Sequence, residues 1–257
     1  MSAVAFHRPD AGVVTVEGPD ALSYLQSLVS QDLDALHDGD WTRSLLLQPQ
    51  GKLTAVFDAQ RVSPDLLVLV TDEGYGPVLA DALHRFRIRV KVEIVDRTGE
   101  WDVYWRTDGA PIVGPRGTVT YDGETLDAGA YERWRVEHGR PRLGADIDDK
   151  TIPQEAFLER DAVSFTKGCF LGQELVCRID TRGHVNRYLR RLTVHDAVPD
   201  RGADVVVGDK TVGTVTSVVP SDDGAIALAM VRHEVEPPAT VRVRWHDHAA
   251  DAQLTTV

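Results

Sequence analysis

The residues best suited to carry out chemistry are grouped in one short segment, residues 167–174, which reads KGCFLGQE. Its two glycines permit backbone conformations that other residues avoid, so the sequence predicts a tight turn that leads into a helix. A thiol at the start of that helix, next to Lys167, would be favoured as the thiolate by the helix dipole and by the ammonium group. We therefore expect Cys169 to be the reactive group, with Lys167 as a second catalytic candidate. The alternative is a small buried cysteine in a turn, which is the commoner case for a lone cysteine.

A second group of charged residues lies in the segment 134–146, WRVEHGRPRLGAD. If Glu137 is buried, its carboxylate could accept two parallel hydrogen bonds from an amidine-like edge, of the kind that a pterin presents. The alternative is an exposed glutamate in the last turn of a helix, where the helix dipole disfavours a negative charge. The sequence therefore makes Glu137 the candidate binding residue.

The cysteine content limits what kind of metal or disulfide chemistry the chain can perform. Only Cys169 and Cys177 occur. On a helix they would lie about 12 Å apart, too far for a disulfide, and two free thiols suit a reducing compartment. An iron–sulfur cluster normally takes about four cysteines, so we expect no cluster enclosed by this chain alone, although a cluster shared with a partner through Cys169 stays open. We predict no metal site at Trp245-His246-Asp247-His248, because strand alternation separates the Asp from the two His.

The charge distribution points toward a small anionic ligand and away from nucleic acid. The net charge of −12 disfavours a general nucleic-acid-binding protein. Residues 133–191 contain 10 Arg and 2 Lys against 9 Asp and Glu, a balance of +3, which leaves −15 for the rest of the chain. These arginines would either bind an anionic ligand or pair with nearby carboxylates. No apolar run reaches the roughly 18 residues needed to span a bilayer, and the N-terminus does not read as a signal peptide, so we expect a cytoplasmic protein without membrane contact.

The periodicity of the apolar residues predicts mixed helices and strands without a regular βαβ alternation, which favours an α+β fold with antiparallel sheets. The expected strands are residues 13–16, 45–47, 53–62, 66–71 and 88–94, and the expected helices are residues 19–29, 77–86 and 128–138. Residues 107–129 are expected to form loops around a short strand. Gly139 is a natural end for the third helix, and Pro141 prevents its continuation.

After about residue 189 the sequence changes to short strands separated by turns, and we place a domain boundary near residues 187–189. The expected strands are residues 192–195, 204–207, 211–219, 225–231 and 240–245. The turn residues Gly208-Asp209-Lys210 predict a hairpin between two of them. Such a run of short strands is typical of a small barrel or sandwich.

These segments together resemble one known family. KGCFLGQE resembles the K-G-C-[FY]-x-G-Q-E signature of the YgfZ family, which belongs to the superfamily of the glycine-cleavage T-protein, an aminomethyltransferase. Other stretches resemble the same superfamily over nearly the whole chain: VEGPDALSYLQSLVSQDLDAL and LQPQGKLTAVFDAQRV near the start, RVEHGRPRLGADIDDKTIPQEA in the middle, and VGTVTSVVPSDDGAIALAMVR near the end.

The resemblance implies a multidomain T-protein-like fold, with antiparallel sheets flanked by helices and a small C-terminal β-barrel. We place a discontinuous folate-binding domain at residues 1–47 and 115–187, a second α+β domain at 48–114, and the barrel at 188–257. The bound cofactor would be tetrahydrofolate or a derivative. By resemblance Glu137 would hold the pterin, an arginine would lie near the folate tail, and Arg135, Arg178 and Gln173 are the further cofactor-binding candidates.

One departure bears on whether the chain is an enzyme. T-protein aminomethyltransferases carry an Asp pair where this chain has Ala55 and Val56, and the nearest carboxylate is Asp58. Two positions along a strand keep the same face but move the group by nearly 7 Å, beyond the tolerance for productive alignment. The resemblance therefore implies a folate-binding accessory protein for iron–sulfur cluster assembly or repair and for Fe–S enzymes such as those that modify tRNA, with an Fe–S carrier or client proteins as partners. The alternatives are a folate-dependent aminomethyl or one-carbon transferase that uses Asp58 or another acid, and a non-catalytic scaffold that docks an Fe–S carrier.

Overall fold

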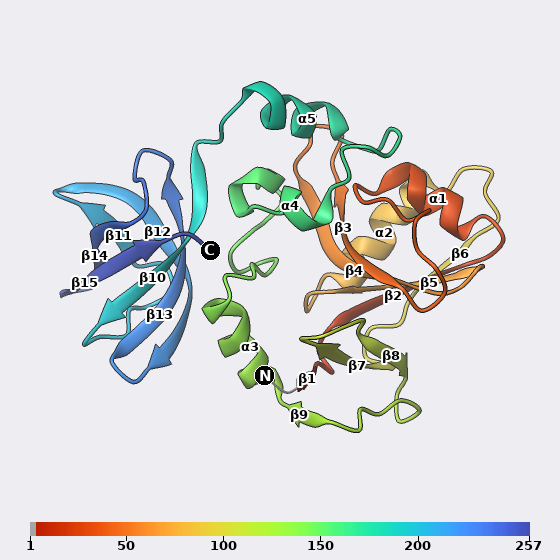
Figure 1. Ribbon diagram of the computed structural model, residues 1–257, viewed down its shortest axis with the longest axis horizontal. Coiled ribbons are helices and arrows are strands. Elements are labelled where there is room, and N and C mark those ends of the chain that lie inside the picture. The colour runs from red at the N-terminus through yellow and green to blue at the C-terminus, as the bar shows by residue number, and fades with distance from the viewer. Residues whose placement is uncertain (1–3) are drawn as a thin grey trace. The chain divides into compact units, whose positions relative to one another are not determined.

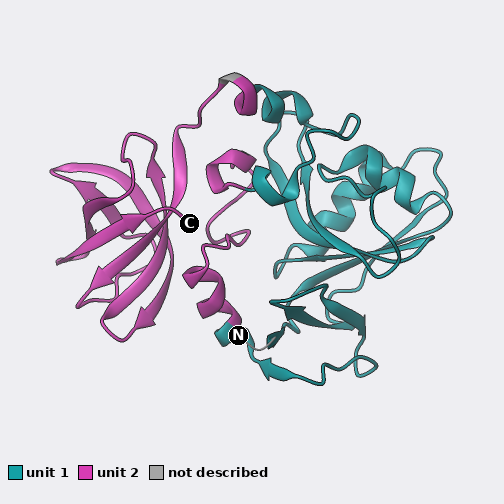
Figure 2. Ribbon diagram, viewed as in Figure 1, with its two compact units in different colours: residues 1–130, 158–178 teal, residues 131–157, 179–257 magenta. Residues whose placement is uncertain are grey.

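The computed structural model describes residues 4–257, which divide into two compact units. Of these residues, unit 1 comprises 4–130 and 158–178, and unit 2 comprises 131–157 and 179–257 (Figure 2). The chain therefore passes from unit 1 to unit 2, returns, and leaves again. The boundaries that the resemblance implies for three domains stay a prediction.

Unit 1 is built on a five-stranded antiparallel sheet with the order β3-β4-β5-β2-β6 (Figure 1). Its strands are β2 (Gly12–Glu17), β3 (Trp41–Leu47), β4 (Leu53–Ser63), β5 (Leu66–Thr71) and β6 (Glu93–Asp96). Helix α1 (Ala21–Leu28) contacts β5, and helix α2 (Gly76–Phe86) contacts β2, β4 and β6. The apolar faces that the sequence predicts for these helices bury Leu25, Leu79 and Leu83 completely.

A second, smaller sheet in unit 1 has the order β8-β7-β1-β9. It consists of β1 (Val4–His7), β7 (Trp101–Arg106), β8 (Ile112–Pro115) and β9 (Glu124–Leu126), with β1 and β9 parallel. The short helix α4 (Glu159–Ala162) contacts β3, and helix α5 (Gln173–Arg182) begins in unit 1. Residues 107–129 thus contain two short strands, where the sequence predicted one.

Unit 2 is dominated by a closed six-stranded barrel with the order β10-β13-β12-β11-β14-β15 (Figure 1). The strands are β10 (Arg187–His195), β11 (Asp204–Val207), β12 (Lys210–Ser221), β13 (Gly224–Arg232), β14 (Ala239–Trp245) and β15 (His248–Thr255). Alternate residues point inward, and many are small, as in β13, where Ala225, Ala227 and Ala229 are fully buried. Helix α3 (Ala128–Glu137), most of which belongs to unit 2, and the 3₁₀-helix η1 (Pro153–Ala156) precede the barrel.

The predicted α+β fold with antiparallel sheets and a C-terminal barrel is confirmed. Val207 pairs with Lys210, so Gly208 and Asp209 form the predicted hairpin turn. No helix in residues 4–257 is long and apolar enough to cross a membrane.

The predicted strand 88–94 is wrong in its first half. Arg89 has a φ of 57°, which turns the backbone out of the extended conformation, and Ile88 is 72% exposed. The backbone N–H of Lys91 donates to Asp20 Oδ2 at 2.7 Å instead of to a neighbouring strand. Strand β6 therefore begins only at Glu93. The sequence also gave no sign of β15, whose polar outer residues weaken its pattern.

Candidate functional site

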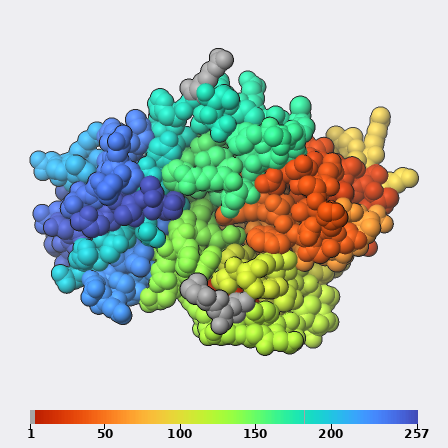
Figure 3. Space-filling view, in the orientation of Figure 1, coloured from red at the N-terminus to blue at the C-terminus, as the bar shows by residue number. Residues whose placement is uncertain are grey.

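The signature segment forms a surface loop of unit 1 that is fastened to the end of α1. The N–H of Ser164 donates to the carbonyl of Ser30 at 2.9 Å, and Ser30 Oγ donates to the carbonyl of Ala162 at 2.6 Å. In the space-filling view the green surface of this segment lies against the red and orange surface of the N-terminal residues (Figure 3). Residues 163–172 are thus held by groups more than 100 positions earlier in the chain.

The side chain of Lys167 makes the main contacts that hold this loop in place. Its Nζ donates to the backbone carbonyls of Val29 at 2.7 Å, Gln26 at 2.8 Å and Gln31 at 2.9 Å. An ammonium group has three protons, so these three acceptors satisfy it. They lie at the C-terminal end of α1, where the helix dipole favours a cation. Lys167 therefore has a structural role here, because it anchors the loop to the end of α1.

Burial lowers the pKa of Lys167 to about 8, although the negative charges of Asp32 and Asp34 act in the opposite direction. The ammonium group also lies 5.9 Å from the centroid of the Phe170 ring. The sequence suggested an ammonium group that would favour a thiolate. In the structure the ammonium group of Lys167 donates its three protons to carbonyl oxygens.

Cys169 is exposed and belongs to no disulfide. The alternative of a small buried cysteine is therefore wrong. The prediction that the thiol lies at the start of a helix is also wrong, because α5 begins four residues later, at Gln173, and the dipole effect fades within one turn. Cys177, which lies inside α5, is half-buried and also belongs to no disulfide.

The other two candidates on the signature segment lie on α5. Gln173 accepts a hydrogen bond from the N–H of Phe170 through its side-chain Oε1 at 3.1 Å, so this glutamine shapes the turn between loop and helix. Arg178 is exposed on the same helix. A cofactor-binding role for Gln173 and Arg178 stays a prediction.

Glu137 is the last residue of α3 and is half-buried, with 34% of its side chain exposed. Its Oε1 accepts from Arg133 Nη1 at 3.4 Å, one helical turn earlier. Within residues 4–257 the second carboxylate oxygen has no hydrogen-bond partner. Gly139 ends the helix with a φ of 68°, and Arg191 Nη1 donates to the backbone carbonyl of Glu137 at 2.9 Å. The carboxylate is therefore held at a fixed helix end with one oxygen available.

Arg135 is the largest fully buried side chain of the described residues. Its guanidinium donates to Asp146 Oδ2 at 2.7 Å and to Ser217 Oγ at 2.8 Å, and both carboxylate oxygens of Glu132 accept from it as well. A longer bond at 3.4 Å reaches the carbonyl of Arg140, so all five N–H groups have acceptors. Burial by itself would lower the pKa of Arg135, but the hydrogen bond with Glu132 and the charges of Asp146 and Glu132 raise it. A cofactor contact by Arg135 would have to replace one of these bonds.

The candidates divide between the two units. Glu137 and Arg135 belong to unit 2, whereas Lys167, Cys169 and the beginning of α5 belong to unit 1. If one folate site used both Glu137 and Cys169, the two side chains would have to face one cavity, and this arrangement stays a prediction. Among residues 4–257 no group of three His, Cys, Asp or Glu side chains is placed to hold a metal ion.

Comparison with known proteins gives relatives that cover most of the chain. It is 28% identical to the tRNA-modifying protein YgfZ of Escherichia coli O157:H7, over 91% of this chain and 87% of the relative. It is 27% identical to the mitochondrial iron-sulfur cluster assembly factor IBA57 homolog of Mycosarcoma maydis, over 73% of this chain and 56% of that protein. The glycine cleavage system aminomethyltransferase T from Bartonella henselae superposes with a TM-score of 0.83 at 18% identity, over 99% of this chain and 85% of that one. The resemblance to YgfZ-type, T-protein-like proteins is confirmed. No family model matches the chain.

The positions at which the resemblance places the T-protein acid pair are apolar and buried. Ala55 is 0% exposed and Val56 is 5% exposed. The nearest carboxylate, Asp58, is 3% exposed and accepts a hydrogen bond from Trp105 Nε1 at 3.0 Å. Asp58 therefore joins β4 to the smaller sheet of unit 1. Sequence reasoning missed this link, since nothing local pairs residue 58 with residue 105.

Proposed function

We propose that this YgfZ-type protein binds tetrahydrofolate or a derivative through Glu137 and supports iron–sulfur cluster assembly or repair through the loop that carries Cys169. The clients would be Fe–S enzymes, including those that modify tRNA, and the partner an Fe–S carrier. The observation that carries the proposal is the similarity, over most of the chain, to a protein named tRNA-modifying and to one named an iron-sulfur cluster assembly factor.

Glu137 supports the folate part of the proposal. Its carboxylate has one oxygen without a partner and one in a long contact with a half-exposed arginine, so both could accept from the paired N–H groups of a pterin. When bound, tetrahydrofolate would supply a carrier for one-carbon groups. The residue's own part is to bind and orient the pterin edge, at a helix end where a second negative charge would be disfavoured but a pair of donors would be favoured.

The exposed thiol supports the accessory role. Cys169 lies on a loop whose position is fixed by Lys167, Ser164 and the end of α1, and its side chain is open to solvent. A thiol so placed can contact a partner protein without rearrangement of the loop. Burial of Asp58 beneath Trp105 and the apolar residues at 55 and 56 disfavour the aminomethyltransferase alternative, because no carboxylate stands where that chemistry needs one.

Isothermal titration with tetrahydrofolate tests the folate part. The wild-type protein should bind, and Glu137→Gln, which removes the charge at nearly constant volume, should weaken binding at least about tenfold, or about 1.4 kcal/mol. Glu236→Gln, at an exposed position in unit 2, serves as the matched control and should leave the affinity unchanged. Absence of binding by the wild-type protein would refute this part.

Complementation of a deletion strain tests the accessory part, with the activity of an aconitase-like Fe–S enzyme as readout. Cys169→Ser should keep folate affinity and lose support of the enzyme, whereas Cys177→Ser should retain both. Full support by Cys169→Ser contradicts a role for this thiol. Full support by Glu137→Gln would instead favour the scaffold alternative, in which folate is dispensable.

A further inference from the structure

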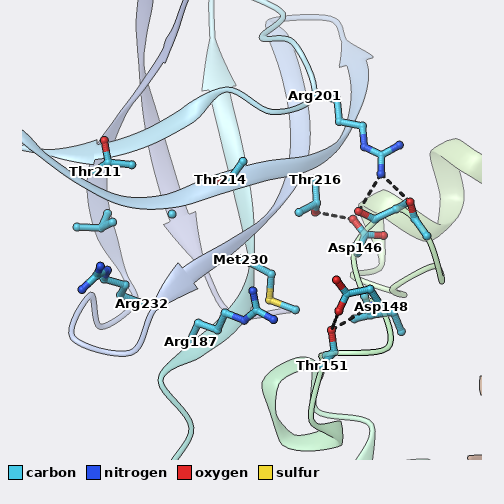
Figure 4. A pocket seen from close by; sticks show the side chains of 15 residues that line it. Asp146, Asp148, Thr151, Arg187, Arg201, Thr211, Thr214, Thr216, Met230 and Arg232 are labelled. Carbon is cyan, nitrogen blue, oxygen red and sulfur yellow. Dashed lines mark hydrogen bonds between the residues drawn. The ribbon is translucent and has the colours of Figure 1, made fainter. Parts of the chain in front are cut away.

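Unit 2 contains a cavity of about 520 Å³ between the barrel and the loop that follows α3. One wall consists of residues 144–148 and Thr151, and the other comes from β12, β13 and the start of β10 (Figure 4). A volume of this size suits a small organic ligand, since ligand cavities measure about 300–1,000 Å³. Neither Glu137 nor Cys169 lines the cavity, so it is independent of the function proposed above.

The loop wall is held rigidly against the barrel. Asp146 has a fully buried side chain, and its Oδ1 accepts from Thr216 Oγ1 at 2.5 Å and Ser217 Oγ at 2.7 Å. From the barrel side, Arg201 Nη2 donates to the carbonyls of Gly144 at 2.8 Å and Ala145 at 3.1 Å. A cavity with fixed walls loses little conformational entropy when a ligand enters.

Two arginines stand directly opposite each other at the edge of this cavity. Arg187 on β10 and Arg232 on β13 are cross-strand partners, and both line the cavity. Like charges in that position destabilise a sheet unless a counter-charge is present. Figure 4 shows Arg187 extending toward the loop that carries Asp148 and Arg232 extending toward Thr211. Positive charge is therefore spread along the cavity.

The existing partners leave this charge partly uncompensated. Arg187 is oriented by Glu155, with Nε to Oε1 at 3.0 Å and Nη2 to Oε2 at 3.3 Å, which leaves three of its five N–H groups available. Arg232 has no ion pair or side-chain hydrogen bond within residues 4–257, and Arg201 contacts only carbonyl oxygens there. The buried Arg135 neutralises Asp146, so Asp148 is the remaining carboxylate of the lining, and it interacts with Arg187. Glu234 interacts electrostatically with Arg232 from outside the lining, but its carboxylate is already paired with Lys210.

We infer that this cavity binds a small, elongated organic molecule with at least two anionic groups, of the phosphate or carboxylate type. One anionic group binds Arg232, and the other binds the free N–H groups of Arg187. Guanidinium groups hold either kind of anion through paired charge-assisted hydrogen bonds. The hydroxyl groups of Thr211 and Thr214 add donors, and Met230 offers an apolar surface to the carbon skeleton.

Titration calorimetry at low ionic strength tests the inference, because salt screens exposed arginines. The probes are fructose 1,6-bisphosphate, citrate and inorganic phosphate. The wild-type protein should bind the bisphosphate or citrate at least about tenfold more tightly than inorganic phosphate, since only the first two can reach both arginines. Tighter binding of the bisphosphate assigns phosphate as the anionic group, and tighter binding of citrate assigns carboxylate.

Arg232→Gln is the decisive variant, because this side chain holds no other part of unit 2 in place. It should weaken binding of the preferred probe at least about tenfold. Arg242→Gln removes the same charge from an exposed position of β14, outside the cavity, and should change the affinity less than about twofold. Equal effects of the two variants, equal affinity for inorganic phosphate, or no binding of any probe at millimolar concentration would overturn the inference.

Discussion

At the scale of single residues, two of the charged side chains that the sequence marked as functional, Lys167 and Arg135, are held by several internal hydrogen bonds. Lys167 satisfies its ammonium group with three carbonyls of residues 26–31. Arg135 satisfies all five N–H groups inside unit 2. A charged group that is taken out of water requires such partners, because its desolvation costs on the order of several kcal/mol per ion unless hydrogen bonds and opposite charges compensate for the lost water. Both residues thus position other groups, whatever ligands they meet.

The titration of Lys167 predicts how stability changes with pH. Its pKa is about 8 in the folded chain and 10.5 for an ordinary lysine. Between these values the unfolded chain binds more protons, so this residue makes folding more favourable as pH rises from 8 to 10. Urea denaturation of the wild-type protein and of Lys167→Met should show a stability difference that grows in favour of the wild-type protein over that interval. A difference that is constant or shrinks with pH would contradict the lowered pKa.

The buried carboxylate of Asp146 accepts hydrogen bonds from Arg135, Ser217 and Thr216. Asp146→Asn leaves the buried guanidinium without one of its two carboxylates, and breaking a buried ion pair costs about 3–5 kcal/mol. We therefore expect unit 2 to unfold at a lower urea concentration. The fluorescence of the tryptophans in that unit monitors the unfolding. Asp251→Asn, at an exposed position of β15, should have no measurable effect. A similar loss from both variants would show that the network adds nothing specific.

At the scale of elements, the two glycines of the signature have different roles. Gly172 has a φ of 76°, and a Cβ placed there would lie 2.4 Å from the carbonyl oxygen of Gln48. Gly168 has no neighbour within 4 Å of its Cβ position and no positive φ. The turn before α5 therefore requires glycine at 172 but tolerates another residue at 168.

Alanine substitutions test this difference. Gly172→Ala should destabilise unit 1 by about 2 kcal/mol or more, through backbone strain and displacement of the loop. Gly168→Ala should change the melting temperature by about a degree at most, since surface substitutions remain within about 0.5 kcal/mol. Differential scanning calorimetry of the two variants provides the measurement. Equal melting temperatures would show that residues 48–51 do not hold the signature loop in place.

Element prediction succeeded where hydrophobic periodicity was strong and failed where a tertiary contact overrode it. The paired strands β4 and β5 and the helices α1, α2 and α3 lie within a few residues of their expected positions. The alternating residues 88–92 do not form a strand, because Arg89 adopts a left-handed conformation and Asp20 takes the N–H of Lys91. Strand β15 was missed because only its barrel neighbours supply the apolar contacts that define it.

At the scale of the whole molecule, charge sets the class of partner. A net charge of −12 repels a polyanionic backbone, which would need a basic face. We expect no saturable binding of bulk tRNA at physiological salt, measured by fluorescence anisotropy with labelled tRNA. Micromolar, salt-dependent binding would contradict this and would indicate that the protein contacts RNA directly.

The sequence by itself determined the class of fold, five of the six strands that form the C-terminal barrel, and the segments that carry Cys169 and Glu137. These features follow from local periodicity, turn residues and a contiguous signature. Each of them can be recognised within one stretch of the sequence, without the segments that this stretch contacts in the fold. The tertiary structure decided what the charged side chains do. The acceptors of Lys167 lie up to 141 positions away, and Arg135 meets Ser217 across 82 positions. The opposition of Arg187 and Arg232 likewise exists only once β10 pairs with β13. Burial and pairing of charges depend on contacts between distant segments, and no local pattern in the sequence encodes them.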